Sequence, residues 1–86
     1  MIKSDFLYGK LSKNILFFLL NNGENYLTLI AKKLNINYSA LWKHVNKFEK
    51  LGLIKSERKG RIRFVNLTPK GILVANHLKE IYELIK

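Results

Sequence analysis

Cysteine is absent from this 86-residue chain, and there is only one proline. Without thiols there is no disulfide, no thiolate zinc cluster and no catalytic cysteine, and a reducing cytoplasm is the natural compartment. A chain of this length forms one domain at most and buries only about 60% of the surface that its unfolded form exposes. We therefore expect a single small cytoplasmic domain that is stabilised by hydrophobic packing.

Long hydrophobic runs are missing as well. The longest extends from Ile15 to Leu20, which is six residues, and an asparagine lies on either side of it. A membrane-spanning helix needs about 18 apolar residues. The first five residues also lack the basic and apolar stretches of a secretory signal. We expect neither a membrane partner nor a targeting segment.

Acidic residues are scarce, because the chain has 6 Asp and Glu against 16 Lys and Arg, a net charge of +10. The excess is uneven, since residues 37–63 alone contain eight basic and two acidic side chains. Positive charge gathered in one segment is typical of proteins that bind a polyanion, most often a nucleic acid. An acidic membrane surface or an acidic protein partner would fit the composition too.

Catalytic constellations are not apparent. Glu49 has no second carboxylate, nucleophile or base at a usable spacing, and the glycines are isolated rather than gathered in a phosphate-binding loop. His44 and His77 are far apart in the sequence, and no cysteine accompanies them. We expect no enzymatic activity, no cofactor and no metal site.

Apolar residues at helical spacing predict helices over about 10–21, 27–34 and 38–51. Only three residues separate the second helix from the third, which is the spacing of a helix-turn-helix. Thr28 is a candidate cap for the second helix, and Asn37 can cap the third because its side-chain oxygen can accept from a backbone N–H. Leu41, Val45 and Phe48 form the inward stripe of that third helix.

After Gly52 the hydrophobic period changes from 3.6 to 2, which predicts strands over 53–58 and 62–67. The residues between them, 59–61, form the tip of a hairpin in which Gly60 supplies a positive φ. The tip and the strands beside it are strongly cationic. The sequence therefore predicts a hairpin that presents positive charge at its far end.

Thr68 and Pro69 are typical of a helix start, because Thr is a good N-cap and Pro is tolerated in the first turn. This last helix extends to about Ile85, with Ile72, Ala75, Leu78 and Tyr82 as its core stripe. Further apolar residues cover much of its remaining circumference, which favours burial of a second face in a homodimer. The dimerisation candidates, including three in the N-terminal arm, are Phe6, Leu7, Tyr8, Leu73, Val74, Leu78, Ile81, Tyr82 and Ile85.

Three stretches carry a family resemblance, namely residues 30–37 (IAKKLNIN), residues 41–54, which end in FEKLGLI, and residues 67–71 (LTPKG). Together they resemble winged helix-turn-helix proteins, in particular the MarR-like transcriptional regulators. The resemblance covers about residues 11–75. It implies an α+β fold with a three-helix core, a β-hairpin wing and an additional C-terminal helix. It also implies that helix 38–51 reads the DNA major groove and that residues 59–61 form the wing tip, on the minor groove or the backbone.

The candidate DNA-binding residues follow from the outward face of helix 38–51 and from the basic residues around it. Lysine can donate to guanine and asparagine can pair with adenine, whereas most surface cations neutralise phosphates. The base-contacting candidates are Tyr38, Ser39, Trp42, Lys43, Asn46 and Lys47, with the indole of Trp42 expected to be exposed. The phosphate and wing candidates are Lys32, Lys33, Lys50, Lys55, Arg58, Lys59, Gly60, Arg61 and Arg63.

The sequence thus predicts one domain over 1–86, divided into an arm (1–9), a core with its wing (10–68) and a dimerisation helix (69–86). The predicted function is sequence-specific binding of double-stranded DNA by a homodimeric regulator, which would be nucleoid-associated in a prokaryote. A protein-interaction module of a larger complex, with Trp42 as the contact, is the alternative from another class. An RNA-binding or structure-specific nucleic-acid-binding protein is a third. No effector is indicated.

Overall fold

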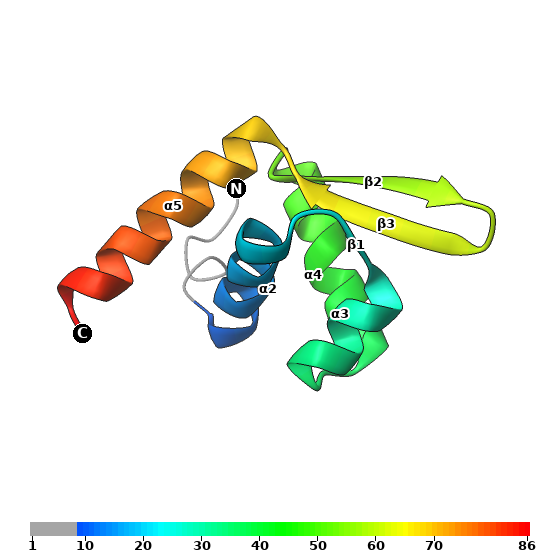
Figure 1. Ribbon diagram of the computed structural model, residues 1–86, viewed down its shortest axis with the longest axis horizontal. Helices are drawn as coiled ribbons and strands as arrows, with labels where there is room; N and C mark the ends of the chain where they lie inside the picture. Colours follow the sequence, from blue (N-terminus) through cyan, green and yellow to red (C-terminus); the bar gives the residue numbers. More distant parts are fainter. Residues whose placement is uncertain (1–8) are drawn as a thin grey trace.

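The computed structural model describes residues 9–86 and has the predicted winged architecture (Figure 1). In that part of the chain, four helices accompany a three-stranded antiparallel sheet. Within residues 9–86, none of the helices has the length and hydrophobicity of a membrane-spanning segment. In chain order the elements are α2 (Lys10–Asn22), β1 (Asn25–Tyr26), α3 (Leu27–Leu34), α4 (Tyr38–Lys50), β2 (Ile54–Lys59), β3 (Ile62–Leu67) and α5 (Pro69–Leu84).

The core lies where α2, α3 and α4 pack together beneath the sheet. Leu16, Ile30, Val45 and Phe48 have no exposed surface, and each comes from the apolar stripe of its helix. Asn35 allows the sharp turn between α3 and α4 because it adopts a left-handed conformation at φ 53°, which asparagine tolerates better than most residues. The helix-turn-helix predicted from spacing is therefore confirmed.

Strand β1 was not predicted from the sequence. It has two residues, and it pairs with β3 so that Asn25 lies opposite Val65 and Tyr26 opposite Phe64. Two residues are too few to show an alternating pattern, so only the fold reveals this strand. Its presence also makes the prediction of Thr28 as a cap wrong, because α3 begins at Leu27 with Tyr26 in the cap position.

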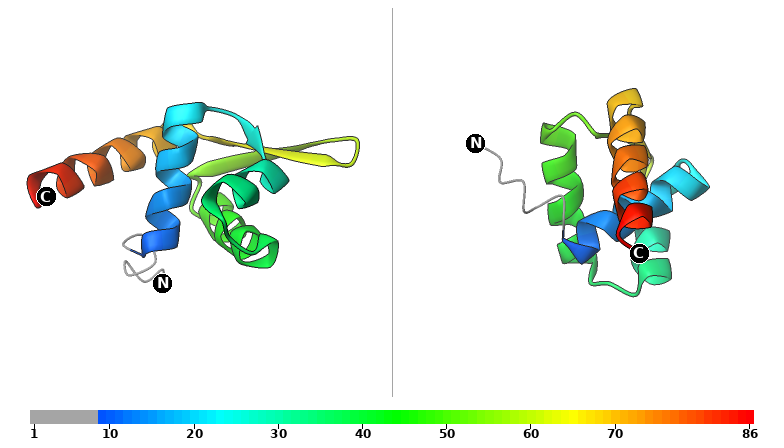
Figure 2. Two further views of the ribbon diagram at one scale, coloured as in Figure 1. Left: turned by 60° about the horizontal axis from the view of Figure 1, so that its bottom comes forward. Right: turned by 90° about the vertical axis from the view of Figure 1, so that its left-hand side faces the viewer.

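The wing is the hairpin of β2 and β3, which extends well beyond the helices in the direction opposite to α5 (Figures 1 and 2). Lys59 pairs with Ile62, so the turn consists of Gly60 and Arg61, and Gly60 has the expected positive φ of 64°. The sheet order is β1-β3-β2, which leaves β2 at an edge. β2 begins one residue later than predicted. The reason is that the backbone N–H of Leu53 donates a hydrogen bond to the Phe48 carbonyl near the end of α4.

A tight corner joins the wing to α5. The Thr68 side chain caps α5 by accepting from the backbone N–H of Gly71 at 3.0 Å, as predicted. The Thr68 N–H donates to the Leu53 carbonyl at 3.0 Å, and the Thr68 hydroxyl donates to the Gly52 carbonyl. A Cβ on Gly71 would overlap the Leu53 carbonyl oxygen. The first turn of α5 thus lies directly against the residues that begin the wing.

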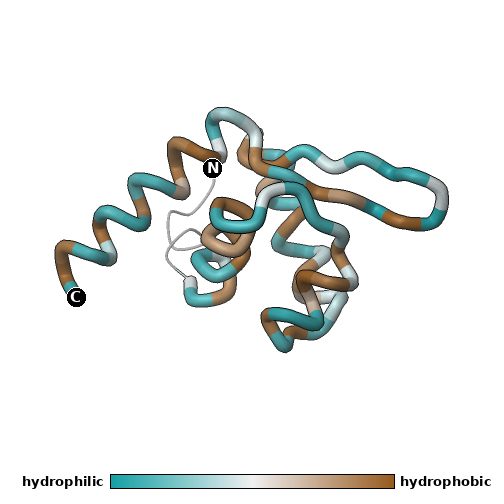
Figure 3. Tube along the Cα trace, in the orientation of Figure 1, coloured by the Kyte–Doolittle hydropathy of each residue, from teal (hydrophilic) through white to brown (hydrophobic). Residues whose placement is uncertain are grey.

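This corner determines which side of α5 faces the core. Two predictions about the residues of α5 are therefore wrong. Gly71, Ala75 and Leu78 are buried, whereas Ile72 is 43% exposed and is not part of the core stripe. Leu78 is only 5% exposed, so its place in the predicted core stripe is confirmed and its place among the dimerisation candidates is wrong. Figure 3 shows apolar positions recurring along α5 to its end.

Other dimerisation candidates divide by exposure. Leu73, Ile81 and Ile85 are exposed, while Val74 and Tyr82 are half-buried. Val74 packs against the core, and the ring of Tyr82 contacts Phe17 edge to face. The arm candidates Phe6, Leu7 and Tyr8 lie outside the described residues. Exposed apolar side chains remain on α5 and at the residue that follows it. We call them together the α5 apolar face, and they are Ile72, Leu73, Ile81, Leu84 and Ile85.

The contact at Gly71 predicts that Gly71→Ala destabilises the protein by about 2 to 3 kcal/mol, because a methyl group there forces the backbone apart. Urea unfolding followed by circular dichroism measures this loss. Asn76→Ala is the control, since Asn76 is exposed on the same helix and the change is neutral or slightly stabilising there. Equal stability of Gly71→Ala and the parent protein would contradict the packing described.

Candidate nucleic-acid interface

Helix α4 begins at a defined residue because Asn37 caps it. The Asn37 Oδ1 accepts from the backbone N–H of Ser39 at 2.7 Å, as the sequence predicts. From there Leu41, Val45 and Phe48 face the core with no exposed surface. The opposite face of α4 is therefore fixed toward the solvent.

Four of the six base-contacting candidates lie together on that outward face. Ser39, Lys43, Asn46 and Lys47 line a shallow hollow of about 600 Å³ along α4. Its other lining residues are Asn37, Ala40, His44 and Lys50, so no carboxylate is among them. Cationic and amide groups on a helix surface match what the major groove offers, namely carbonyl and ring-nitrogen acceptors on the bases.

His44 joins this hollow although the sequence did not single it out as a site residue. It is half-buried, and its Nδ1 lies 3.0 Å from the Ala40 carbonyl one turn earlier. A carbonyl can only accept, so Nδ1 carries the proton in this arrangement. The angular position of His44 at the border of the buried stripe was the only sequence signal for it.

The remaining two candidates, Tyr38 and Trp42, face the wing instead. They line a separate cleft of about 280 Å³ between α4, the start of α3 and the hairpin. The indole of Trp42 is half-buried, and the Arg63 guanidinium lies 4.3 Å from its ring centroid. The expectation of an exposed indole is therefore wrong, because a side chain from the wing covers it.

Arg63 connects the wing to α4 by hydrogen bonds as well. Its Nη1 donates to the Ser56 hydroxyl at 3.3 Å, and that hydroxyl donates to Glu49 Oε1 at 3.0 Å. Glu49 is thus the acceptor at the end of a chain that begins on the wing. No local sequence pattern signals these contacts, since their members come from α4, β2 and β3.

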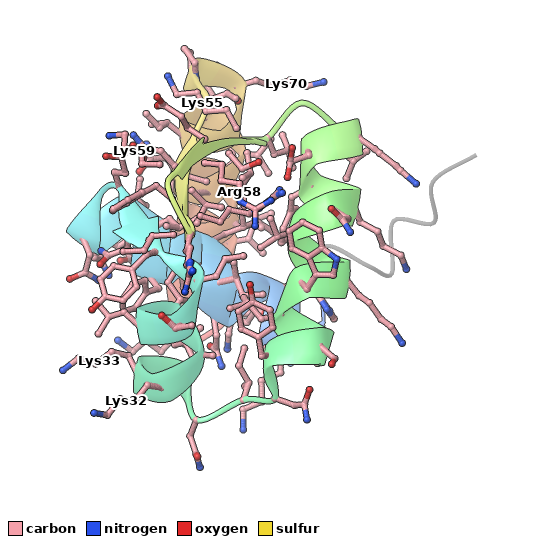
Figure 4. The ribbon with its side chains drawn as sticks, turned by 90° about the vertical axis from the view of Figure 1, so that its right-hand side faces the viewer. Lys32, Lys33, Lys55, Arg58, Lys59 and Lys70 are labelled. Carbon is pink, nitrogen blue, oxygen red and sulfur yellow. The ribbon has the colours of Figure 1, made fainter. Side chains whose placement is uncertain are left out.

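The two faces of the wing carry different cations. Arg58 lies directly opposite Arg63 across the strands, on the face toward α4, and Figure 4 shows Arg58 on that side. Lys55 and Lys59 point to the other side of the hairpin in the same view. The ammonium group of Lys59 lies 5.0 Å from the ring centroid of Phe64, which helps to hold it there.

Three lysines outside α4 and the wing point to two different sides of the molecule. Lys32 and Lys33 end α3 and point away from α4 (Figure 4). Lys70 was not predicted, and it points to the side on which α4 lies. Its Nζ donates to the Leu51 carbonyl at 3.2 Å. Sequence position alone did not distinguish these directions.

Comparisons with known proteins agree with this arrangement. A family described as winged helix-turn-helix DNA-binding matches residues 10–55. A protein of Archaeoglobus fulgidus is 31% identical over 67 residues, which cover 78% of this chain and 70% of that protein. The expected resemblance is confirmed.

Solved structures give the same result. A crystal structure of an Archaeoglobus fulgidus protein superimposes with a TM-score of 0.81 at 28% identity and covers 98% of each chain. A transcriptional regulator homologue of Pyrococcus horikoshii has a TM-score of 0.84 at 28% identity, covering 96% of this chain and 87% of that one. The whole described fold, α5 included, therefore has structural counterparts.

The cap of α4 predicts that Asn37→Ala lowers the free energy of unfolding by about 1 kcal/mol, because the Ser39 N–H loses its acceptor. Asn37→Asp is the matched control, since a carboxylate retains an acceptor at the same place. Urea midpoints of the three proteins measure the difference. If Asn37→Ala and Asn37→Asp unfold alike, the side chain does not cap the helix.

Proposed function

Because this chain belongs to the winged helix-turn-helix DNA-binding family, we propose that it is a homodimeric transcriptional regulator that binds specific double-stranded DNA sequences. The observation that carries the proposal is the hollow on the outward face of α4. Lysine and asparagine side chains line it, no carboxylate interrupts it, and the cationic wing lies beside the same helix. An α-helix with such a surface fits the major groove of B-DNA.

Within this proposal, Lys43 and Asn46 read bases. Lys43 is exposed, and Asn46 lies one turn further along the same side of α4. A lysine can donate to O6 and N7 of guanine, and an asparagine can pair with N6 and N7 of adenine. Ser39 and Lys47, which line the same hollow, complete this reading surface.

The wing contributes contacts that do not depend on sequence. Arg61 lies in the two-residue turn at its far end and is exposed. An arginine at that position can enter a minor groove or neutralise a phosphate, and the narrow minor grooves of A·T-rich DNA attract it most. The lysines of the wing add to the positive potential that draws in the DNA backbone.

The α5 apolar face supports the dimer. Leu73 is 61% exposed and Ile85 is 74% exposed, which is unusual for large aliphatic residues that recur along one helix. Two copies joined through α5 would present two α4 helices to successive turns of DNA. The alternative of a protein-interaction module anchored on Trp42 loses its main support, because Arg63 covers the indole.

The base-reading role predicts a loss of specificity when Lys43→Ala is combined with Asn46→Ala, because each base contact contributes to discrimination. The ratio of the affinity for a selected operator to that for random duplex should fall at least tenfold. Arg61→Ala instead weakens both duplexes equally and reduces the slope of log affinity against log salt by about one. Fluorescence anisotropy at several salt concentrations measures both effects. If the double variant keeps its full preference, α4 does not read the bases through these residues.

The dimer predicts that Ile81→Glu converts a species of twice the 10.1 kDa chain mass into a monomer, because a charge placed in an apolar interface is not solvated there. Light scattering at micromolar concentration measures the mass. Lys79→Glu places the same carboxylate on an exposed side of α5 that faces away from Leu73, Ile81 and Leu84, and it leaves the dimer intact. A parent protein that is already monomeric would refute the interface.

A further inference from the structure

The cleft between the wing and α4 is distinct from the hollow that the base-reading proposal uses. Its volume of about 280 Å³ is just below the roughly 300 Å³ at which pockets for drug-sized molecules begin. Three arginines line it, Arg58, Arg61 and Arg63, and no acidic residue does. A small polar cleft with this lining suits a small anion.

The pairing of β2 with β3 places two arginines opposite each other, and their repulsion destabilises the free protein. Arg58 and Arg63 are register partners in an antiparallel hairpin, so their side chains leave the sheet on the same face. Like charges directly opposite each other destabilise a sheet. Among residues 9–86, nothing forms a hydrogen bond or an ion pair with the guanidinium of Arg58 or Arg61. The cleft therefore keeps an excess of positive charge, since the Glu49 carboxylate reaches Arg63 only through the Ser56 hydroxyl.

Arg63 is held in place before any anion arrives. One face of its guanidinium lies on the indole of Trp42, and Nη1 is bound to the Ser56 hydroxyl. The chain continues to Glu49 on α4, which anchors Ser56 in turn. The other donors of the Arg63 fork have no partner among the described residues. A preorganised guanidinium loses less side-chain freedom when it binds a phosphate, and its planar fork matches two phosphate oxygens.

The wall opposite the wing adds to the same potential. Leu27 and Thr28, in the first turn of α3, line the cleft. Tyr26 in the cap position makes no side-chain hydrogen bond to this turn. A helix start carries partial positive charge.

We propose that this cleft binds one phosphate group through Arg58, Arg61 and Arg63, of which Arg63 is held in place by Trp42 and Ser56. The group comes either from the backbone of bound duplex DNA or from a free phosphorylated compound. The first source rests on the proposed function, and the second does not. A phosphate between Arg58 and Arg63 also removes the repulsion across the strands.

Trp42 is the sole tryptophan of the chain and lines the cleft, so its fluorescence reports occupancy. Inorganic phosphate is titrated against chloride at matched ionic strength. We expect a saturable change in the parent protein and at least a tenfold higher phosphate Kd for Arg58→Gln. Lys79→Gln removes the same charge from exposed α5 and leaves the Kd within twofold. No saturable change, or an equal Kd in Arg58→Gln, would overturn the proposal.

A second measurement uses the free protein. Arg58→Gln raises Tm by about 2 °C at low salt, because one of two like charges is gone. Lys79→Gln does not. A Tm of Arg58→Gln below that of Lys79→Gln would contradict the uncompensated repulsion on which the proposal depends.

Duplex binding separates the two sources. A larger loss of duplex affinity in Arg58→Gln than in Lys79→Gln identifies the backbone as the source, and an equal loss identifies a free phosphorylated compound. Both results support the phosphate site, provided that the fluorescence titration shows saturable phosphate binding. A parent protein that binds phosphate but no duplex would refute the proposed function while supporting this cleft.

Discussion

The close approach of Gly71 to the Leu53 carbonyl sets the geometry on which the rest of this protein depends. The backbone N–H of Thr68 donates to the same Leu53 carbonyl, and the N–H of Leu53 donates to the Phe48 carbonyl near the end of α4. Helix α4, the wing and α5 therefore leave one corner in fixed directions. Because a side chain on residue 71 would separate them, the orientation of α4 relative to the α5 apolar face is determined by the absence of a Cβ.

Much of the fold could be predicted from the sequence because its determinants are local. Asn37 and Thr68 cap their helices by hydrogen bonds to nearby backbone groups, and Gly60 occupies a left-handed turn position. These interactions depend on neighbours in the chain, so residue type reveals them. The two-residue strand β1 depends on a partner far away in the sequence, and no local pattern revealed it.

The candidate site was predictable in outline and not in its contacts. Periodicity identified the outward face of α4, which the structure confirms. It could not show that Arg63 stacks on Trp42, because that contact requires the wing to fold back toward the helix. Periodicity placed Leu78 correctly in the core stripe of α5, but it also placed Ile72 there, since an apolar helix gives no sign of which side the Gly71 corner turns inward. Local rules fail mainly where tertiary contacts decide the outcome.

The position of β2 at the edge of the sheet has a consequence for solubility. An edge strand offers unpaired backbone groups to any second copy, and such strands are frequent starting points of aggregation. Lys55 and Lys59 lie on this strand, and charged side chains, lysine above all, disfavour strand addition. The lysines of β2 thus also keep the wings of neighbouring copies from joining into a shared sheet.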